Sequence, residues 1–193
     1  MAENIHPFNM LGASEISDAV SILKQSNKDH ENSSFSYISL EEPEKKLLKE
    51  NTNLERIVKI VGVGQKSNGF EATISLSKRE VIKEEEISNN AGPTYTLAEI
   101  FRAIELTVED EDYQKALKKR GITDLSLIQI DPWPGGGFVN KNIKKGNRAL
   151  RAISFLKDSE KDNAYARPIQ GLIAHVDLTE NQVVEIEDHG VVK

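Results

Sequence analysis

The chain has 193 residues, a formal net charge of −6, 38% hydrophobic residues and no cysteine. This balance is typical of a globular protein of one large or two small domains, and it excludes disulfides, thiolate metal sites and a cysteine nucleophile. The acidic total argues against nucleic acid or an anionic membrane as a partner, and we find neither a membrane-spanning run nor a secretory signal, so we expect a cytoplasmic protein.

The first half of the chain begins with an amphipathic helix pattern, for which Ser14 is the expected N-cap. Its apolar side chains recur at positions i, i+3, i+4 and i+7: Ile16, Ala19, Val20 and Leu23. Strands are expected at 35–40 and 56–63, followed by a hairpin over 72–85. The charged segment 41–53 fits either a short exposed helix or a loop.

The second half repeats this pattern. Its helix has the same apolar spacing and begins with a capping box, in which Thr96 and Glu99 would bond each other's backbone amides. The apolar positions are Leu97, Ile100, Phe101 and Ile104. Strands are expected at 125–130 and 148–156, and a hairpin at 174–187 matches the earlier hairpin at a constant offset. We therefore predict an α+β fold of two duplicated domains, each with one helix on about four antiparallel strands.

The turn-rich stretch 89–94 predicts a boundary between domains at 1–91 and 92–193. The second copy is longer between its helix and its hairpin, and the added residues fall around 131–138 and 163–172. Both segments are apolar but rich in proline or glycine, which we expect to exclude a continuous helix or sheet there. Function often lies in such additions to a stable scaffold.

The residues themselves indicate no catalytic centre. The four histidines are too far apart in sequence to form a local metal pair: His6, His30, His175 and His189. We expect His175 to be a solvent-facing strand residue rather than a ligand. Gly62–Ser67 lacks the spacing of a phosphate-binding loop, and the basic residues 115–120 are explained by a helix that ends at Gly121. No nucleophile is paired with a base, so no catalytic and no metal-binding residue is predicted.

Several motifs nevertheless resemble the N-terminal region of copper-containing primary amine oxidases, in order and spacing across essentially the whole chain. These are His6-Pro7-Phe8 with Glu15-Ile16, Arg120-Gly121-Ile122, Asp131-Pro132-Trp133, the stretch Asn163 to Leu172, and Ile186-Glu187-Asp188-His189-Gly190. In that family this region forms two small cystatin-like domains, each with one helix on an antiparallel sheet. The resemblance therefore implies the same duplicated α+β fold.

The resemblance also implies a parent enzyme that oxidatively deaminates primary amines to aldehydes, releasing ammonia and hydrogen peroxide. That chemistry uses copper, held by three histidines that include a His-x-His pair, and topaquinone, made from the tyrosine of an Asn-Tyr-Asp/Glu motif. Neither motif is present here, because the four tyrosines follow Ser, Thr, Asp and Ala. We expect both cofactors in a C-terminal catalytic domain beyond Lys193, and we expect this stretch alone to hold no cofactor and to be inactive.

By the matching motifs, this region would help to line the channel through which the amine reaches the catalytic domain. Pro132 and Trp133 would form one wall, with Tyr165 opposite and Phe101 (or Ile100) nearby. Packing between domains without substrate contact is the alternative for Trp133 and Tyr165, and either role predicts an exposed apolar patch in the isolated region.

The implied partners are the catalytic domain of the same protein, the primary amine substrate and a second copy in the parent homodimer, with no nucleic acid and no membrane. The competing hypothesis is a free-standing cystatin-like interaction module without enzymatic activity. A protease-inhibitor role is disfavoured because the Gln-x-Val-x-Gly hairpin is missing.

Overall fold

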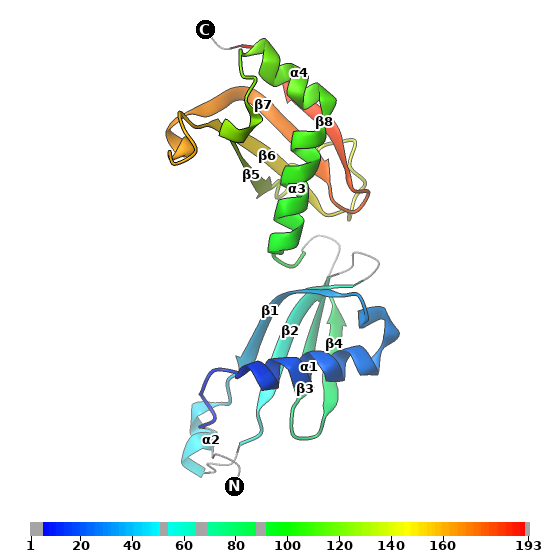
Figure 1. The fold of residues 1–193 in the computed structure, drawn as a ribbon. Coiled ribbons are helices and arrows are strands. Elements are labelled where there is room, and N and C mark those ends of the chain that lie inside the picture. Colours follow the sequence, from blue (N-terminus) through cyan, green and yellow to red (C-terminus); the bar gives the residue numbers. More distant parts are fainter. Residues whose placement is uncertain (1–5, 51–53, 65–68, 88–91, 192–193) are drawn as a thin grey trace. The chain divides into compact units, whose positions relative to one another are not determined.

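The computed structural model describes residues 6–50, 54–64, 69–87 and 92–191. The chain divides into two compact units, a first unit at 1–96 and a second unit at 97–193 (Figure 1). The boundary expected after residue 91 adjoins residues 88–91, which lie outside the described residues. No helix of the described parts is long and apolar enough to cross a membrane.

The first unit is a four-stranded antiparallel sheet with strand order β1-β2-β3-β4 and a helix across one face (Figure 1). Its elements are α1 (Ala13–Ser26), the 3₁₀ helix η1 (Lys28–His30), β1 (Ser34–Glu41), α2 (Lys45–Glu50), β2 (Ile57–Val63), β3 (Gly69–Ser75) and β4 (Glu80–Glu86). The expected helix, strands and hairpin are confirmed, and the undecided charged segment contains the short helix α2. The expected cap was wrong: α1 is capped at Gly12, whose N–H donates to the Glu15 carboxylate at 2.9 Å, and Ser14 lies inside the helix.

The core of the first unit follows the two periodicities seen in the sequence. From α1, Ala19, Ile22 and Leu23 are buried against the sheet. In β2 every second residue is buried, because alternate strand residues face the helix. The sheet contributes Val58, Ile60, Phe70, Ala72 and Ile74 to this core.

The second unit repeats the sheet, with strand order β5-β6-β7-β8. Its elements are α3 (Leu97–Glu109), α4 (Glu111–Lys119), η2 (Leu125–Leu127), β5 (Ile128–Pro134), β6 (Ala149–Leu156), η3 (Ala164–Ala166), β7 (Pro168–Asp177) and β8 (Gln182–Asp188). The expected helix that ends at Gly121 is confirmed as α4, although its break from α3 was not expected. It begins because Asp110 has an extended backbone and its carboxylate accepts a hydrogen bond from the Tyr113 N–H at 2.8 Å, which caps a new helix.

The prolines of β5 correct the expectation that the 131–138 segment excludes a strand. Pro132 and Pro134 both lie in β5, and the pairing with β6 runs through them without a register shift. β5 is an edge strand, so only one of its sides pairs with another strand of the sheet. A proline has no N–H, and where that N–H would point to the open side no hydrogen bond to β6 is lost. Pro168 is tolerated for a related reason, as the first residue of β7.

The two units share details that only a common architecture explains. The turns of both hairpins hold a non-glycine residue at positive φ, Arg79 at 55° and Asn181 at 56°. The last two strands of both sheets are offset by an irregularity at the same place in the repeat. A further shared feature is a largely buried ion pair between the first turn of the long helix and the residue before the second or sixth strand. These pairs are Glu15 with Arg56 and Glu99 with Arg148.

Arg120 connects the C-terminal end of α4 to the start of β7 and the end of β8 through hydrogen bonds. Its guanidinium donates to the Asp188 carboxylate at 2.7 Å and to the carbonyls of Ala116, Gly171 and Gly190 at 2.8–3.0 Å. The side chain of Arg120 is only 6% exposed. The Arg120-Gly121-Ile122 and Ile186 to Gly190 motifs, distant in sequence, therefore meet as one structural anchor.

This anchor predicts an acid-sensitive stability. The hydrogen bond from Arg120, followed by that from the Gly190 N–H, lowers the pKa of Asp188 from 3.8 to about 2. The ionised carboxylate stabilises the fold in full above about pH 4, and this contribution of between about 1 and 2 kcal/mol is lost as the pH falls through 2. In urea titrations we expect the difference in unfolding free energy between the unmodified protein and Asp188→Asn to stay level from pH 6 to about pH 4.5 and then to shrink steadily towards pH 2.5. A difference that stays constant over this range would contradict the assignment.

Candidate functional site

Three side chains of the second unit meet on the face of the sheet that α3 does not cover. Asp131 and Trp133 are two residues apart on β5, so they share that face, and Tyr165 comes from η3. The Trp133 indole N–H donates to Asp131 Oδ2 at 2.8 Å, and the Tyr165 hydroxyl donates to the same oxygen at 3.4 Å. We call these three residues the Asp131 cluster.

The two aromatic rings of the Asp131 cluster are held in place but remain accessible. Asn163 caps η3 by accepting a hydrogen bond from the Tyr165 N–H at 3.0 Å. The ring of Phe155 packs edge-on against that of Tyr165, with centroids 5.1 Å apart. Trp133 and Tyr165 are each 54% exposed, which confirms the expected exposure of both aromatic residues.

The other predicted site residues lie elsewhere in the second unit. Pro132 is buried in β5 opposite Ala152 and therefore faces away from the Asp131 cluster. Phe101 is 59% exposed on α3, and Ile100 is half-buried one residue before it. Among the described residues, Phe101 makes no ring contact with Trp133 or Tyr165. The structure thus brings together two of the four predicted residues.

Sequence reasoning gave Asp131 no role, although the signal for one was present. In a strand, residues i and i+2 point to the same face, so a strand through residues 131–133 places this carboxylate beside the indole. The segment was expected to be a loop because of its prolines, and a loop carries no such periodicity.

His175 is covered rather than solvent-facing, contrary to expectation. It is only 7% exposed, and the loop after β5 folds over it, because Asn140 and Asn142 donate side-chain hydrogen bonds to Glu185, the β8 partner of His175. His175 Nε2 lies 2.9 Å from Glu187, and the hydrogen bonds to His175 and His189 lower the pKa of Glu187. The longer loop of the second copy therefore buries an otherwise exposed strand position.

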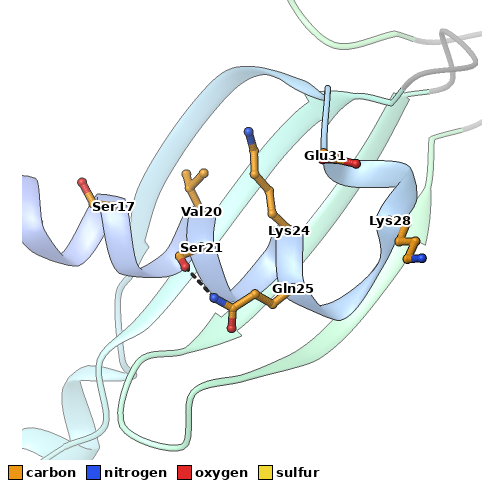
Figure 2. A pocket seen from close by; sticks show the side chains of 7 residues that line it. All are labelled: Ser17, Val20, Ser21, Lys24, Gln25, Lys28 and Glu31. Carbon is orange, nitrogen blue, oxygen red and sulfur yellow. Dashed lines mark hydrogen bonds between the residues drawn. The ribbon is translucent and has the colours of Figure 1, made fainter.

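Two surface hollows are lined by side chains that do not form a cluster comparable to the Asp131 cluster. In the first unit, a hollow of about 680 Å³ lies along α1 and η1 (Figure 2). Its lining side chains are mostly exposed and polar: Ser17, Val20, Ser21, Lys24, Gln25, Lys28 and Glu31. The Lys24 ammonium lies 5.9 Å from the centre of the Phe35 ring. Gln25 donates a hydrogen bond to the Ser21 hydroxyl at 3.0 Å (Figure 2). In the second unit, a hollow of about 400 Å³ is bordered by Arg120 and Arg167, whose guanidinium groups are paired with Asp188 and with Asp158 and Asp162.

The residues present do not fit the cofactors that the resemblance implies. Within the described parts of the chain, no three His, Cys, Asp or Glu side chains are grouped to hold a metal ion. The hydroxyl of Tyr113 is buried 2.6 Å from that of Ser154, and burial raises the pKa of Tyr113 to about 12. No step of amine oxidation is therefore assigned to these residues.

Comparison with known proteins decides the family. Residues 98–193 match the family model of the copper amine oxidase N3 domain, and residues 6–56 match that of the N2 domain. The chain belongs to the copper amine oxidase family. All positions of the Asp131 cluster fall within the N3 match, as do the two family motifs that meet at Arg120.

Bacterial copper amine oxidases resemble the chain along nearly its whole length. The primary amine oxidase of Arthrobacter sp. (strain P1) is 33% identical over 184 residues, which cover 95% of this chain and 28% of that protein. Histamine oxidase of Arthrobacter globiformis is 32% identical, with 97% of this chain and 28% of that protein covered. The primary amine oxidase of Klebsiella aerogenes is 30% identical, with 97% and 25% covered. The chain thus spans less than a third of the length of these relatives.

The fold is shared with a solved copper amine oxidase. The copper-containing benzylamine oxidase from Hansenula polymorpha superposes with a TM-score of 0.77 at 14% identity, over 95% of this chain and 30% of that one. This likeness confirms the fold alone.

Proposed function

We propose that this chain is the accessory region of a copper/topaquinone primary amine oxidase, packing on the catalytic domain and helping to line the substrate channel. The parent enzyme would convert primary amines to aldehydes, ammonia and hydrogen peroxide in the cytoplasm, as a homodimer. Copper and topaquinone would be held by parts of the parent outside these residues. The proposal is supported by the two family matches and by relatives that are about three to four times longer.

The observation that carries the channel role is the pair of accessible aromatic rings in the Asp131 cluster. Large aromatic side chains that stay half exposed in a compact unit are typical of surfaces that meet a partner or a ligand. A primary amine with an apolar tail needs a lined passage, and the faces of Trp133 and Tyr165 can attract its ammonium group by cation–π contact. Phe101, which is exposed on α3, is a further candidate for the lining, whereas Pro132 is buried and is not assigned to it.

Size and staining of the native protein test the proposal directly. An antibody raised against this chain should detect, in the source cells, a band several times larger than 21.5 kDa that stains for quinone. A stain-negative band at 21.5 kDa would instead support a free-standing interaction module.

In the full-length oxidase we expect Tyr165→Ala to change substrate preference rather than the chemical step. Loss of one aromatic wall should raise KM for an aromatic amine such as 2-phenylethylamine by about tenfold, with kcat changed much less. Tyr37→Ala, an equally exposed tyrosine in the first unit, is the matched control. If both substitutions raise KM equally, the assignment of Tyr165 to the channel lining is wrong.

A further inference from the structure

We propose that Arg151 binds a carboxylate of the catalytic domain of the parent oxidase and thereby fixes the open face of the second sheet against that domain. The open face is the face of the sheet β5 to β8 that α3 does not cover. This inference rests on the proposed function, and it names the contact through which this region packs on its partner.

Arg151 lies near the middle of the open face. On β6 it pairs with Trp133 of β5 on one side and with His175 of β7 on the other, and residues opposite each other in antiparallel strands point to the same face. The loop after β5 lies against its side chain, because a Cβ added to Gly135 would be 3.6 Å from Arg151 Cδ. The side chain is therefore half-buried between this loop and the sheet.

The guanidinium of Arg151 lacks an acceptor. Its Nε is buried without a hydrogen-bond partner, and within the ranges that the structure describes its side chain forms neither a hydrogen bond nor an ion pair. The acidic side chains of the open face, Asp131, Glu185 and Glu187, accept hydrogen bonds from other residues. A partly desolvated cation without a counter-charge costs free energy, so this side chain suits a partner that brings an acceptor.

Water alone does not replace the missing counter-charge. The cavity beside Arg151 and His175 has a volume of about 10 Å³, which is room for one water molecule at most. A water there would accept one hydrogen bond from Nε but would leave the positive charge uncompensated. A carboxylate, in contrast, neutralises the charge and can accept two parallel N–H bonds from a guanidinium group.

The surface beside Arg151 has the composition of a protein interface. Val139 borders the same cavity as Arg151 and is 48% exposed, and Phe138, the residue before it, is 84% exposed. Arginine and aromatic side chains that are desolvated together contribute much of the binding energy in protein interfaces. We assign the catalytic domain as the occupant, because the relatives are three to four times longer and a second domain of the same chain is present at high effective concentration.

The test compares the thermal unfolding of Arg151 variants in this chain and in the full-length oxidase. In this chain, Arg151→Met should leave the unfolding midpoint within about 2 °C of the unmodified protein or raise it, because no internal partner is lost. In the full-length oxidase the same variant should lower the midpoint by about 5 °C, because the carboxylate of the catalytic domain then lies buried without its cation. Arg151→Lys keeps the charge and should restore part of the loss. Lys118→Met removes an exposed cation from α4, and we expect no effect in either protein.

Cleavage by chymotrypsin after Phe138 provides a second readout that depends on neither stability nor activity. Phe138 is exposed in a glycine-rich loop of this chain, so we expect ready cleavage there. In the full-length oxidase the covered loop should be cut at least about tenfold more slowly. Arg151→Met in the oxidase should raise the rate of this cut at least about threefold, whereas Lys118→Met should not change it.

The outcomes separate this inference from the proposed function. If the native protein is a 21.5 kDa chain that does not stain for quinone, the proposed function fails and the Arg151 contact fails with it. If the full-length protein is a quinone-containing oxidase but Arg151→Met lowers the unfolding midpoint equally in both proteins, or in neither, only the Arg151 contact is overturned. Equally fast cleavage after Phe138 in the chain and in the oxidase would show that the loop is not covered, which also overturns the contact.

Discussion

Replacement of Arg120 by methionine is expected to destabilise the second unit by about 3 kcal/mol. The side chain is 6% exposed and compensates the charge of Asp188 while satisfying carbonyls from α4, β7 and the segment after β8. Methionine has a similar length but no donor, so the Asp188 carboxylate would lose its buried cation and each of these carbonyls would lose one hydrogen bond. Urea unfolding of this chain, followed by far-ultraviolet circular dichroism, measures the loss.

The neighbouring lysine provides a matched control. Lys119 lies 3.3 Å from the same carboxylate, but its side chain is 67% exposed. Because exposed ion pairs contribute little, Lys119→Met should cost less than about 0.5 kcal/mol. Similar losses for the two variants would mean that charge alone, rather than the buried hydrogen-bond network, holds this end of the sheet together.

Replacement of Arg56 by methionine is expected to destabilise the first unit by about 3 kcal/mol and to loosen the segment that leads into α1. Arg56 pairs with Glu15 and also donates to the carbonyls of His6, Pro7 and Asn9 at 3.0–3.3 Å. Its side chain is 12% exposed, so the loss leaves the largely buried Glu15 carboxylate without its cation and removes the hydrogen bonds that hold the segment before α1. Urea unfolding measures the stability, and limited proteolysis should cut before α1 much faster in the variant.

Arg79→Met is the control for this experiment. Arg79 also reaches a carboxylate on α1, that of Asp18 at 3.5 Å, but both side chains are more than half exposed. We expect Arg79→Met to lower the free energy of unfolding by no more than about 0.5 kcal/mol and to create no new cleavage site. If proteolysis before α1 is equally slow in Arg56→Met, the anchoring role of Arg56 is wrong.

The duplicated architecture could be predicted from sequence because its signals are local and occur twice. Helix periodicity predicted both long helices, and strand alternation in the two hairpins predicted the sheet face that packs against each helix. The buried face of α3 was predicted wrongly, because Leu97 and Phe101 are exposed while Ala103 and Thr107 are buried. The break between α3 and α4 could not be predicted in this way. It depends on the backbone of one residue, Asp110, within a stretch whose composition suits a continuous helix.

The resemblance was recognised from motifs that are mostly structural anchors. Glu15 pairs with Arg56, and the motifs around Arg120 and Asp188 meet across the second unit. The cluster that can contact a ligand was predicted only in part, because its geometry depends on β5 being a strand. Whether a proline is compatible with a strand depends on which neighbours that strand has, and this is a property of the sheet rather than of the sequence around the proline.

Pro132 and Pro134 also affect the tendency of the chain to aggregate at high protein concentration. An open sheet edge normally presents alternating N–H and C=O groups that can recruit a strand from another molecule and begin aggregation. Since pairing with β6 passes through Pro132 and Pro134 undisturbed, the donors that these residues lack are missing from the outer edge of β5. That edge can accept hydrogen bonds but cannot complete a ladder, so the strand that carries Asp131 and Trp133 can stay exposed without seeding intermolecular sheets.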